Sequence, residues 1–332
     1  MHPRDALFDA QEQLPALPVC DHYAGVEVRM RKSLELQAEL GPVFDVTLDA
    51  EDGAPVGGEA EHAHLMAELI MGPQNLHGRV GARLPAPGSP VFHAVARTLI
   101  QRAGARVAYL MVPKIESAKQ WQQVAKDLDA LAKSAGLKRT LPLHALVETH
   151  GALRDVQALA AHPRIESLSF GLMDFVSAHR GAIPQSAMSA TGQFEHPLVV
   201  RAKLEIAAAC HGHGKTPSHS VVTEFKDKNA LQAAATRAIR QLGFTRMWSI
   251  HPSQVRPIIE AFAPTAAEVD QAIEILQAAQ AVQWAPIQHR GVLHDRASYR
   301  YFWHVIARAH RTSMADGPQL PAQVREAFFG SV

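Results

Sequence analysis

Two carboxylates stand at positions where they would serve a metal-dependent reaction. Glu148 ends an apolar run within residues 143–149, and Asp174 ends a similar run at residues 165–174. Such runs are typical of buried parallel strands, whose carboxyl ends open at one end of a barrel, so both acids are expected to face one cleft. Paired carboxylates without a cysteine or histidine cluster suit Mg2+ or Mn2+, which keeps several waters. Capping of the next helix is the structural alternative for each acid.

Other polar residues follow the remaining apolar runs. They are Glu51 and Asp52 after the second run, Arg83 at the end of the third, Lys114 after the fourth and His251 after the eighth. Arg83 is the candidate for binding a substrate carboxylate, because a guanidinium forms a bidentate pair with it. Lys114 is expected in a salt bridge on the rim or in catalysis, but a Schiff-base role needs a dry pocket, which the neighbouring acids oppose. His251 is expected to be a structural strand terminus.

A histidine tract comprises His211, His213 and His219, with glycines between the first two and after the second. The tract has the composition of a metal-binding segment, but the glycines leave the ligands unfixed. A solvated turn between a helix and a strand is the expected structure.

The elements that must position these residues alternate between strand and helix. The strand candidates are residues 17–20, 43–49, 79–84, 106–112, 143–148, 165–170, 218–222 and 247–252. The helix candidates between them are residues 28–40, 59–70, 91–103, 117–135, 152–161, 198–210 and 229–241. This alternation predicts a closed (β/α)8 TIM barrel. An open dinucleotide-binding sheet is disfavoured because no Gly-x-Gly-x-x-Gly follows the first strand.

The chain is expected to divide into a barrel with an N-terminal arm, residues 1–263, and a C-terminal helical cap segment, residues 264–332. Residues 1–16 are expected to form a leading helix or an arm. Residues 176–197 are polar and longer than an ordinary loop, which is typical of a functional loop. The C-terminal segment is expected to contain only helices, at residues 266–282 and 297–310, around a loop at residues 285–290.

The composition narrows the class of protein. A formal net charge of +1 over 332 residues removes the electrostatic argument for a nucleic-acid or membrane-surface partner. Two distant cysteines, Cys20 and Cys210, argue against a disulfide framework and fit a reducing compartment. The sequence contains no apolar run of the roughly 18 residues that a membrane span needs and no N-terminal targeting pattern, so a cytoplasmic protein is expected.

Six ordered motifs resemble the citrate lyase beta-subunit-like family, which groups with malyl-CoA and citramalyl-CoA lyases and hydroxy-oxo-diacid aldolases. The motifs are residues 48–54, Arg83, and residues 112–117, 146–149, 170–175 and 250–255. The resemblance covers roughly residues 17–310. It implies a Mg2+-dependent carbon–carbon lyase on a (β/α)8 barrel, assembled as trimers or hexamers in which C-terminal segments cap a neighbour's site.

The resemblance also implies roles for individual residues. Glu148 and Asp174 match the metal ligands, and Arg83 matches the arginine that binds the oxo acid. Glu51 and Asp52 match an acidic pair that orders metal-bound water and the active site. In the segment Gly291-Val292-Leu293-His294-Asp295, the aspartate matches the acid/base residue that acts on the acyl-CoA carbon from an adjacent subunit. Capping of the final helix is the alternative for Asp295.

Three departures from the family pattern leave the substrate open. Residues 18–25 replace the usual segment that meets the CoA end of the substrate, Leu84 replaces an asparagine, and Met173 replaces a glutamate beside the metal aspartate. From the resemblance, the first hypothesis is a lyase for a CoA ester such as malyl-, citramalyl- or citryl-CoA. The alternatives are a CoA-independent pyruvate or oxaloacetate aldolase and a catalytically silent barrel subunit.

Overall fold

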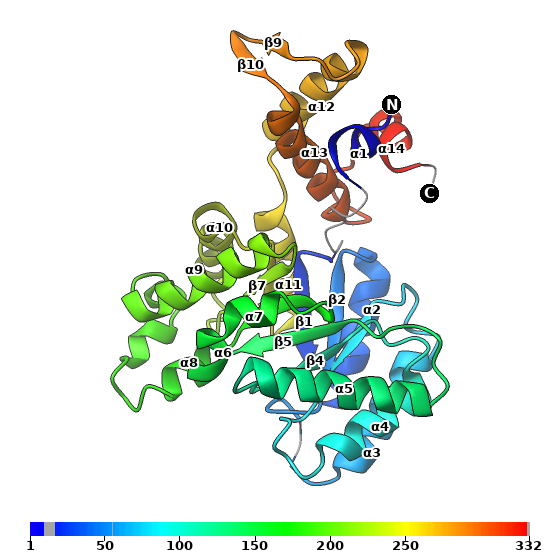
Figure 1. The fold of residues 1–332 in the computed structure, drawn as a ribbon, viewed down its shortest axis with the longest axis vertical. Coiled ribbons are helices and arrows are strands. Elements are labelled where there is room, and N and C mark those ends of the chain that lie inside the picture. The colour runs from blue at the N-terminus through cyan, green and yellow to red at the C-terminus, as the bar shows by residue number, and fades with distance from the viewer. Residues whose placement is uncertain (10–16, 55, 331–332) are drawn as a thin grey trace.

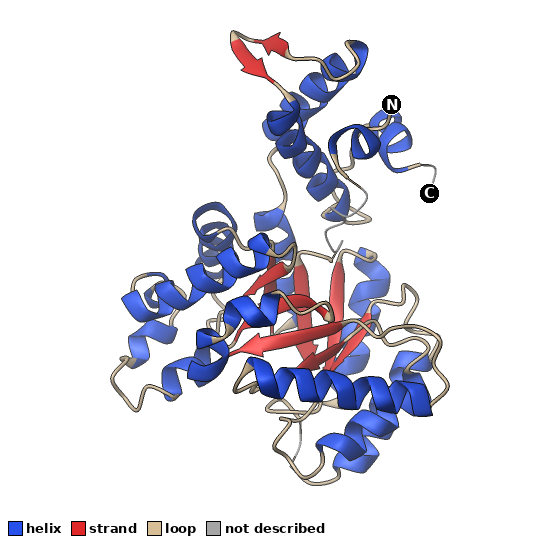
Figure 2. Ribbon diagram, in the orientation of Figure 1, coloured by secondary structure: helices blue, strands red, loops and turns tan. Residues whose placement is uncertain are grey.

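The computed structural model describes residues 1–9, 17–54 and 56–330. Eight parallel strands close into a barrel in which neighbours along the chain are neighbours in space, and β8 pairs with β1 (Figures 1 and 2). The predicted TIM barrel is confirmed. The strands are β1 (Cys20–Ala24), β2 (Phe44–Asp49), β3 (Val80–Arg83), β4 (Leu110–Val112), β5 (Leu143–Val147), β6 (Ile165–Phe170), β7 (Thr216–His219) and β8 (Arg246–Ser249).

Several strand boundaries differ from those expected. Strand β1 begins at Cys20, where the expected strand ended, and β4 is limited to three residues from Leu110. Strand β7 begins earlier, at Thr216, and β8 ends at Ser249, before His251. The ladders set these limits, because a strand extends only where at least one neighbour pairs with it: β4, for example, covers the residues that pair with β3 or β5.

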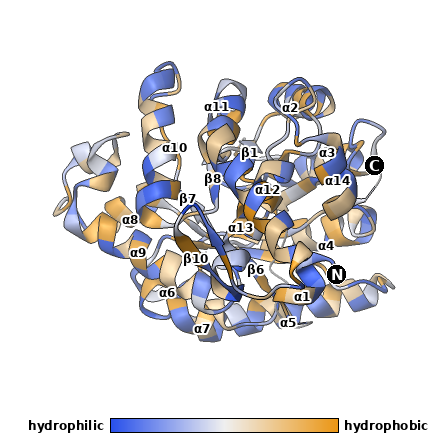
Figure 3. Cartoon of the chain, turned by 90° about the horizontal axis from the view of Figure 1, so that it is seen from above, coloured by the Kyte–Doolittle hydropathy of each residue, from blue (hydrophilic) through white to orange (hydrophobic). Residues whose placement is uncertain are grey.

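Helices surround the barrel and carry both hydrophobic and hydrophilic residues (Figure 3). They are α2 (Glu27–Leu40), α3 (Glu59–Met71), α4 (Phe92–Ala103), α5 (Ala118–Ser134), α6 (His150–Arg154), α7 (Val156–Ala160), α8 (Leu172–Ser177), α9 (Pro197–Gly212), α10 (Lys228–Leu242) and α11 (Pro252–Phe262). The expected single helix at 152–161 is two short helices that meet at Asp155. The expected long loop at 176–197 contains the end of α8 and two 3-10 helices, η1 (Gln185–Met188) and η2 (Gly192–Phe194).

A buried ionic network joins the strands at which the barrel closes. The guanidinium of Arg246 on β8 lies 2.6 Å from Asp45 on β2 and 3.0 Å from Asp21 on β1. Asp21 also accepts hydrogen bonds from Thr47 at 2.6 Å and Tyr109 at 2.9 Å. Arg246 and the two carboxylates are fully buried. Since a buried charge is costly without a partner, these ion pairs specify which strands meet.

The C-terminal segment forms an extension with a core of its own (Figure 1). Its elements are α12 (Ala266–Ala281), β9 (Ile287–His289), β10 (Val292–His294), α13 (Arg296–Arg311) and α14 (Ala322–Phe329). The expectation of helices alone is wrong, because β9 and β10 pair as an antiparallel hairpin. The first helix, α1 (Pro3–Leu7), contributes Ala6 and Leu7 to this second core; residues 10–16 of the expected arm lie outside the described residues.

Replacing Arg246 tests the network. We expect Arg246→Met to lower the free energy of unfolding by about 3–5 kcal/mol, because it leaves Asp21 buried without its cation. Urea unfolding measures this change. Arg201→Met is the matched control, since Arg201 pairs with Glu205 on the surface, where an ion pair contributes about 0–1 kcal/mol. Equal losses in the two variants would contradict the role of the network.

Candidate active site

Glu148 lies at the mouth of the barrel, directly after β5, and is buried. Its Oε1 accepts a 2.7 Å hydrogen bond from the backbone N–H of Lys114. The carboxylate packs against Gly171, since a Cβ built there would lie 2.2 Å from Glu148 Oε2. Burial, with the like charge of Asp174 as the next contribution, raises the pKa of Glu148 to about 8. The positive groups near Glu148 are therefore too few to keep its pKa at the ordinary value.

Asp174 approaches the same mouth from the next unit of the barrel. It lies in the first turn of α8, after β6, rather than at the strand end itself. Its side chain is 41% exposed, and its Oδ1 is 3.9 Å from Lys114 Nζ. Because a helix N-terminus favours negative charge, α8 stabilises this carboxylate without a capping role. The structure thus brings Glu148 and Asp174 to one site, as the sequence indicated.

Lys114 connects the acids around the mouth. Its Nζ lies 2.5 Å from Glu51 Oε1 and 3.1 Å from Asp52 Oδ1. These acids raise the pKa of Lys114 against the opposing effect of its partial burial. Its φ of 50° is left-handed, a strained conformation for a non-glycine residue, and accompanies the hydrogen bond from its amide to Glu148. Of the two roles considered for Lys114, the structure shows the salt bridge.

Arg83, at the end of β3, is buried and held by two acids. Its Nε and one terminal nitrogen donate to Asp49 at 2.7 and 2.6 Å, and the other terminal nitrogen is 3.0 Å from Glu51. The interactions with Asp49 and Glu51 raise the pKa of Arg83 although burial opposes this. Sequence reasoning missed Asp49. Its alternation with Asp45 and Thr47 along β2 is the pattern that indicates a common face.

Glu51 and Asp52 play different parts in this cluster. The Glu51 side chain is 7% exposed and bridges Arg83 and Lys114, whereas that of Asp52 is 57% exposed and contacts Lys114 alone of these two cations. Burial raises the pKa of Glu51 despite its cationic neighbours. Partial burial raises the pKa of Asp52, but the hydrogen bonds with Lys114 and Glu51 and the charges of Lys114 and Arg83 together lower it. Both predicted acids therefore lie at the mouth.

An apolar cluster next to these charges was not expected from the sequence. Its members are Tyr23, Met111, Leu146, Val221 and Trp248, with Met173 packed against them. Tyr23 stacks on Trp248 with ring centroids 4.7 Å apart, and the Arg83 guanidinium lies 5.3 Å from the Tyr23 ring. Among the described residues, Tyr23 OH and Trp248 Nε1 are buried without hydrogen-bond partners. The site therefore combines charged groups with a neighbouring aromatic surface that carries two free donors.

The remaining predicted residues lie elsewhere. Asp295 caps α13, accepting from the amides of Ala297 and Ser298, in the extension rather than at its own barrel's mouth. His251 has the expected structural, hydrogen-bonded role, but as the N-cap of α11, two residues after the end of β8, rather than as the strand terminus itself. His219 is fully buried in β7, which contradicts the predicted solvated turn for this residue; barrel burial overrides the polar local sequence.

The donor set fits a hard divalent cation. Within the described part of the chain, no group of three or more His, Cys, Asp and Glu side chains is arranged to hold a metal. Glu148 and Asp174 would thus supply two carboxylate ligands, and water or substrate oxygens would complete the coordination, as Mg2+ requires. The repulsion and burial that raise the pKa of Glu148 would be offset by such an ion.

Comparison with known proteins identifies the family. The HpcH/HpaI aldolase/citrate lyase model matches residues 44–252, which span β2 to β8 and every site residue named above except Tyr23 and Asp295. The chain belongs to this family. The resemblance inferred from the six motifs is confirmed.

Individual relatives agree with this assignment. An L-malyl-CoA/beta-methylmalyl-CoA lyase of Cereibacter sphaeroides is 26% identical over 284 residues, covering 81% of this chain and 88% of the relative. A citrate lyase crystal structure from Burkholderia xenovorans is 48% identical, covers 99% of both chains and gives a TM-score of 0.84. CitE of Mycobacterium tuberculosis, in complex with magnesium, acetoacetate and coenzyme A, shares the fold with a TM-score of 0.66 at 21% identity, covering 89% and 98% of the two chains.

A methyl group at Gly171 tests the packing of Glu148. We expect Gly171→Ala to lower the free energy of unfolding by about 1–3 kcal/mol, because the new Cβ would overlap the Glu148 side chain. Urea unfolding provides the measurement. Gly212→Ala is the control: it lies in α9 with no atom within 4 Å of an added Cβ, and alanine there should be neutral or stabilise by about 1 kcal/mol. A stabilised Gly171→Ala variant would contradict this packing.

Proposed function

We propose that the protein is a Mg2+-dependent lyase that cleaves or forms a carbon–carbon bond in a β-hydroxyacyl-CoA, such as malyl-, citramalyl- or citryl-CoA. The observation that carries the proposal is the buried Glu148 carboxylate, gathered with Asp174 and Arg83 at the mouth of the barrel. Membership of the HpcH/HpaI aldolase/citrate lyase family supports the reaction class. Mg2+, or Mn2+ in its place, would be held by Glu148 and Asp174.

Arg83 is suited to bind the carboxylate of the substrate. A guanidinium has five N–H donors, and the ion pairs to Asp49 and Glu51 engage one on each of its three nitrogens. One N–H on each terminal nitrogen is therefore left for a substrate carboxylate. Asp49 fixes the plane of the guanidinium, so the orientation of the substrate is set before it binds.

The acids and the lysine around Arg83 hold the charged groups of the site in position during the reaction. When bound, the metal would supply Lewis-acid stabilisation of the negative charge that develops on the substrate. Glu51 holds Arg83 and Lys114 in place, and Lys114 orients Glu148 through its backbone amide. Asp52, the more exposed acid, contacts Lys114 and would order water at the mouth together with Glu51.

A neighbouring subunit would complete the site with Asp295. In the cleavage direction, water held near Glu51 and Asp52 would take the hydroxyl proton, the oxygen would become a carbonyl as the carbon–carbon bond breaks, and the electron pair of that bond would form the enolate of the acyl-CoA. Asp295, as the acid, would then protonate that carbon. Asp295 follows the β9–β10 hairpin, which stands at the far end of the extension (Figure 1). The hairpin exposes Val292 and Leu293, at 57% and 72%, and such exposed apolar side chains suit contact with a second copy in a trimer or hexamer.

A CoA-independent aldolase is the second candidate, favoured by one feature of the site. The altered segment at residues 18–25 places Tyr23 on the apolar cluster at the mouth, and Met173 packs against it beside Asp174. An apolar neighbour suits a compact oxo acid as well as an acyl group. Turnover of malyl-, citramalyl- and citryl-CoA against 4-hydroxy-2-oxo acids, each with and without Mg2+, separates the two. Absence of turnover with every substrate would favour a silent subunit.

Removal of one metal ligand tests the metal centre. Glu148→Gln should weaken Mg2+ binding, measured by isothermal titration, and reduce lyase kcat/KM by on the order of 100-fold or more, because Lewis-acid stabilisation is worth several kcal/mol. Glu61→Gln, at an exposed position on α3, is the matched control and should behave as the parent protein. Retained Mg2+ binding and turnover in Glu148→Gln would show that the assignment is wrong.

Mixed oligomers test the origin of Asp295. Glu148→Gln and Asp295→Ala should each be inactive alone, yet co-expression should restore activity, because some sites then combine an intact Glu148 with an intact Asp295 from a neighbour. Turnover by the purified mixed oligomers is the measurement. Full activity of Asp295→Ala alone, or no recovery on mixing, would exclude a catalytic Asp295 supplied by an adjacent subunit.

A further inference from the structure

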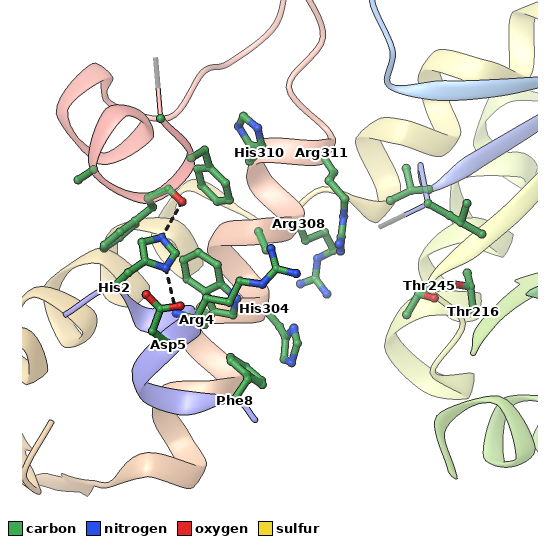
Figure 4. A pocket seen from close by; sticks show the side chains of 18 of the residues that line it. His2, Arg4, Asp5, Phe8, Thr216, Thr245, His304, Arg308, His310 and Arg311 are labelled. Atoms are coloured by element: carbon green, nitrogen blue, oxygen red, sulfur yellow. Dashed lines mark hydrogen bonds between the residues drawn. The ribbon is translucent and has the colours of Figure 1, made fainter. Parts of the chain in front are cut away.

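A cleft of about 1160 Å³ separates the extension from the base of the barrel. One wall consists of α1, α13 and α14, and the other consists of residues that precede or begin β1, β7 and β8. Figure 4 shows the side chains that face this space. Glu148 lies at the opposite end of the strands, after β5, so the cleft is separate from the candidate active site.

Helix α13 turns a row of basic side chains toward the cleft. His304, Arg308 and Arg311 are spaced at i, i+4 and i+7, which places them on one face of the helix. Among the described residues, no carboxylate forms an ion pair with Arg308 or Arg311, and the Nε atoms of both are buried without a hydrogen-bond partner. Buried arginine donors are rarely left without an acceptor. The cleft has room for a ligand that would accept hydrogen bonds from these two side chains.

The charges around these arginines are not balanced. Burial lowers the pKa of Arg308, and the cation of Arg240 adds to this effect, whereas Glu268 and Tyr301 oppose it without reversing it. Burial also lowers the pKa of Arg311, with Arg308 as the second cause. Among the described residues, the acids that line the cleft are Asp5, Asp9 and Glu326, and none of these three is among the charges that shift either pKa. Asp5 lies on α1 beside Arg4 (Figure 4). Within the described part of the chain, Arg308 and Arg311 therefore face the cleft without an acid paired to either of them.

The barrel supplies a complementary wall. Lys215, whose pKa burial lowers, lies beside Thr216 at the start of β7, and Thr245 precedes β8. Figure 4 shows Arg308 and Arg311 extending toward Thr216 and Thr245 across the open space. Hydroxyl donors opposite guanidinium groups are a combination that suits the oxygens of a phosphate.

We propose that this cleft binds a small polyanion of the phosphate class, which bridges Arg308 and Arg311 of the extension to Lys215 and the threonines of the barrel. The cleft is as large as pockets for drug-sized ligands, so it accommodates more than one phosphate group. The bound anion would tie the extension to the barrel. This site goes beyond the proposed lyase reaction and does not depend on it.

Binding of pyrophosphate to the full chain tests the proposal. In metal-free buffer, isothermal titration should show saturable binding that weakens as ionic strength rises. The double variant Arg308→Gln/Arg311→Gln should lose at least about tenfold in affinity, because each charge-assisted hydrogen bond is lost. Arg290→Gln is the matched control, since Arg290 lies in the same extension but pairs with Glu274 on the surface. It should bind as the parent protein does.

A second readout separates a ligand site from a structural role. Without anion, the double variant should unfold at the parent temperature or above it, because two uncompensated charges are removed. Pyrophosphate should raise the unfolding temperature of the parent and not that of the double variant. A lower unfolding temperature of the anion-free double variant would instead indicate structural arginines and overturn the proposal.

Other outcomes would also overturn the proposal. These are equal affinity in the parent and the double variant, absence of pyrophosphate binding, and binding of citrate in place of pyrophosphate. Binding abolished by Arg83→Gln but retained in the double variant would place the anion at the mouth of the barrel. A changed oligomeric state of the double variant, with no anion binding by the parent, would assign the cleft to a second copy of the chain.

Discussion

The structure depends on charges that are buried inside a closed barrel and compensated there. Arg246 joins β8 to Asp21 on β1 and Asp45 on β2, at the seam where the first and last strands meet. Near the carboxyl ends of the strands, Arg83 joins β3 to Asp49 on β2. Because a buried ion without its partner is far more costly than one at the surface, these contacts restrict the register in which the strands pair. The same register sets the position of Glu148 along the axis of the barrel.

Glu148 differs from those groups because its compensation is incomplete. The Lys114 amide donates to it, yet burial and Asp174 still raise its pKa. Lys114 is drawn to Glu51 and Asp52 instead. A mouth with a surplus of buried negative charge next to an oriented arginine is a suitable place for a divalent cation and a carboxylate substrate. This imbalance is the physical link between the fold and the lyase chemistry proposed for it.

The cleft at the other end of the barrel shows the opposite imbalance. Arg308 and Arg311 are partly buried without acids to pair with in the described chain, while other extension cations such as Arg290 are paired. The extension has its own core, which includes α1. It contacts the barrel through Met314, which packs in the barrel core, and through the Arg256–Asp316 pair. The barrel and extension also meet around the cleft that Arg308 and Arg311 face, so an anion bound there would strengthen this junction. The division of the chain at residue 263 stays a prediction.

The sequence by itself determined the alternation of eight strands with helices, and with it the barrel and the strand ends that carry Glu51, Arg83, Lys114 and Glu148. Period and composition are local properties, so they can be read without the fold. The tertiary structure alone decided which groups contact one another. Asp49 pairs with Arg83, Tyr23 stacks on Trp248, and the Lys114 amide donates to Glu148. It also buried His219, shortened β4 and folded residues 287–294 into a hairpin. These outcomes depend on contacts between residues distant in the chain or on pairing with neighbouring strands, which no local pattern encodes.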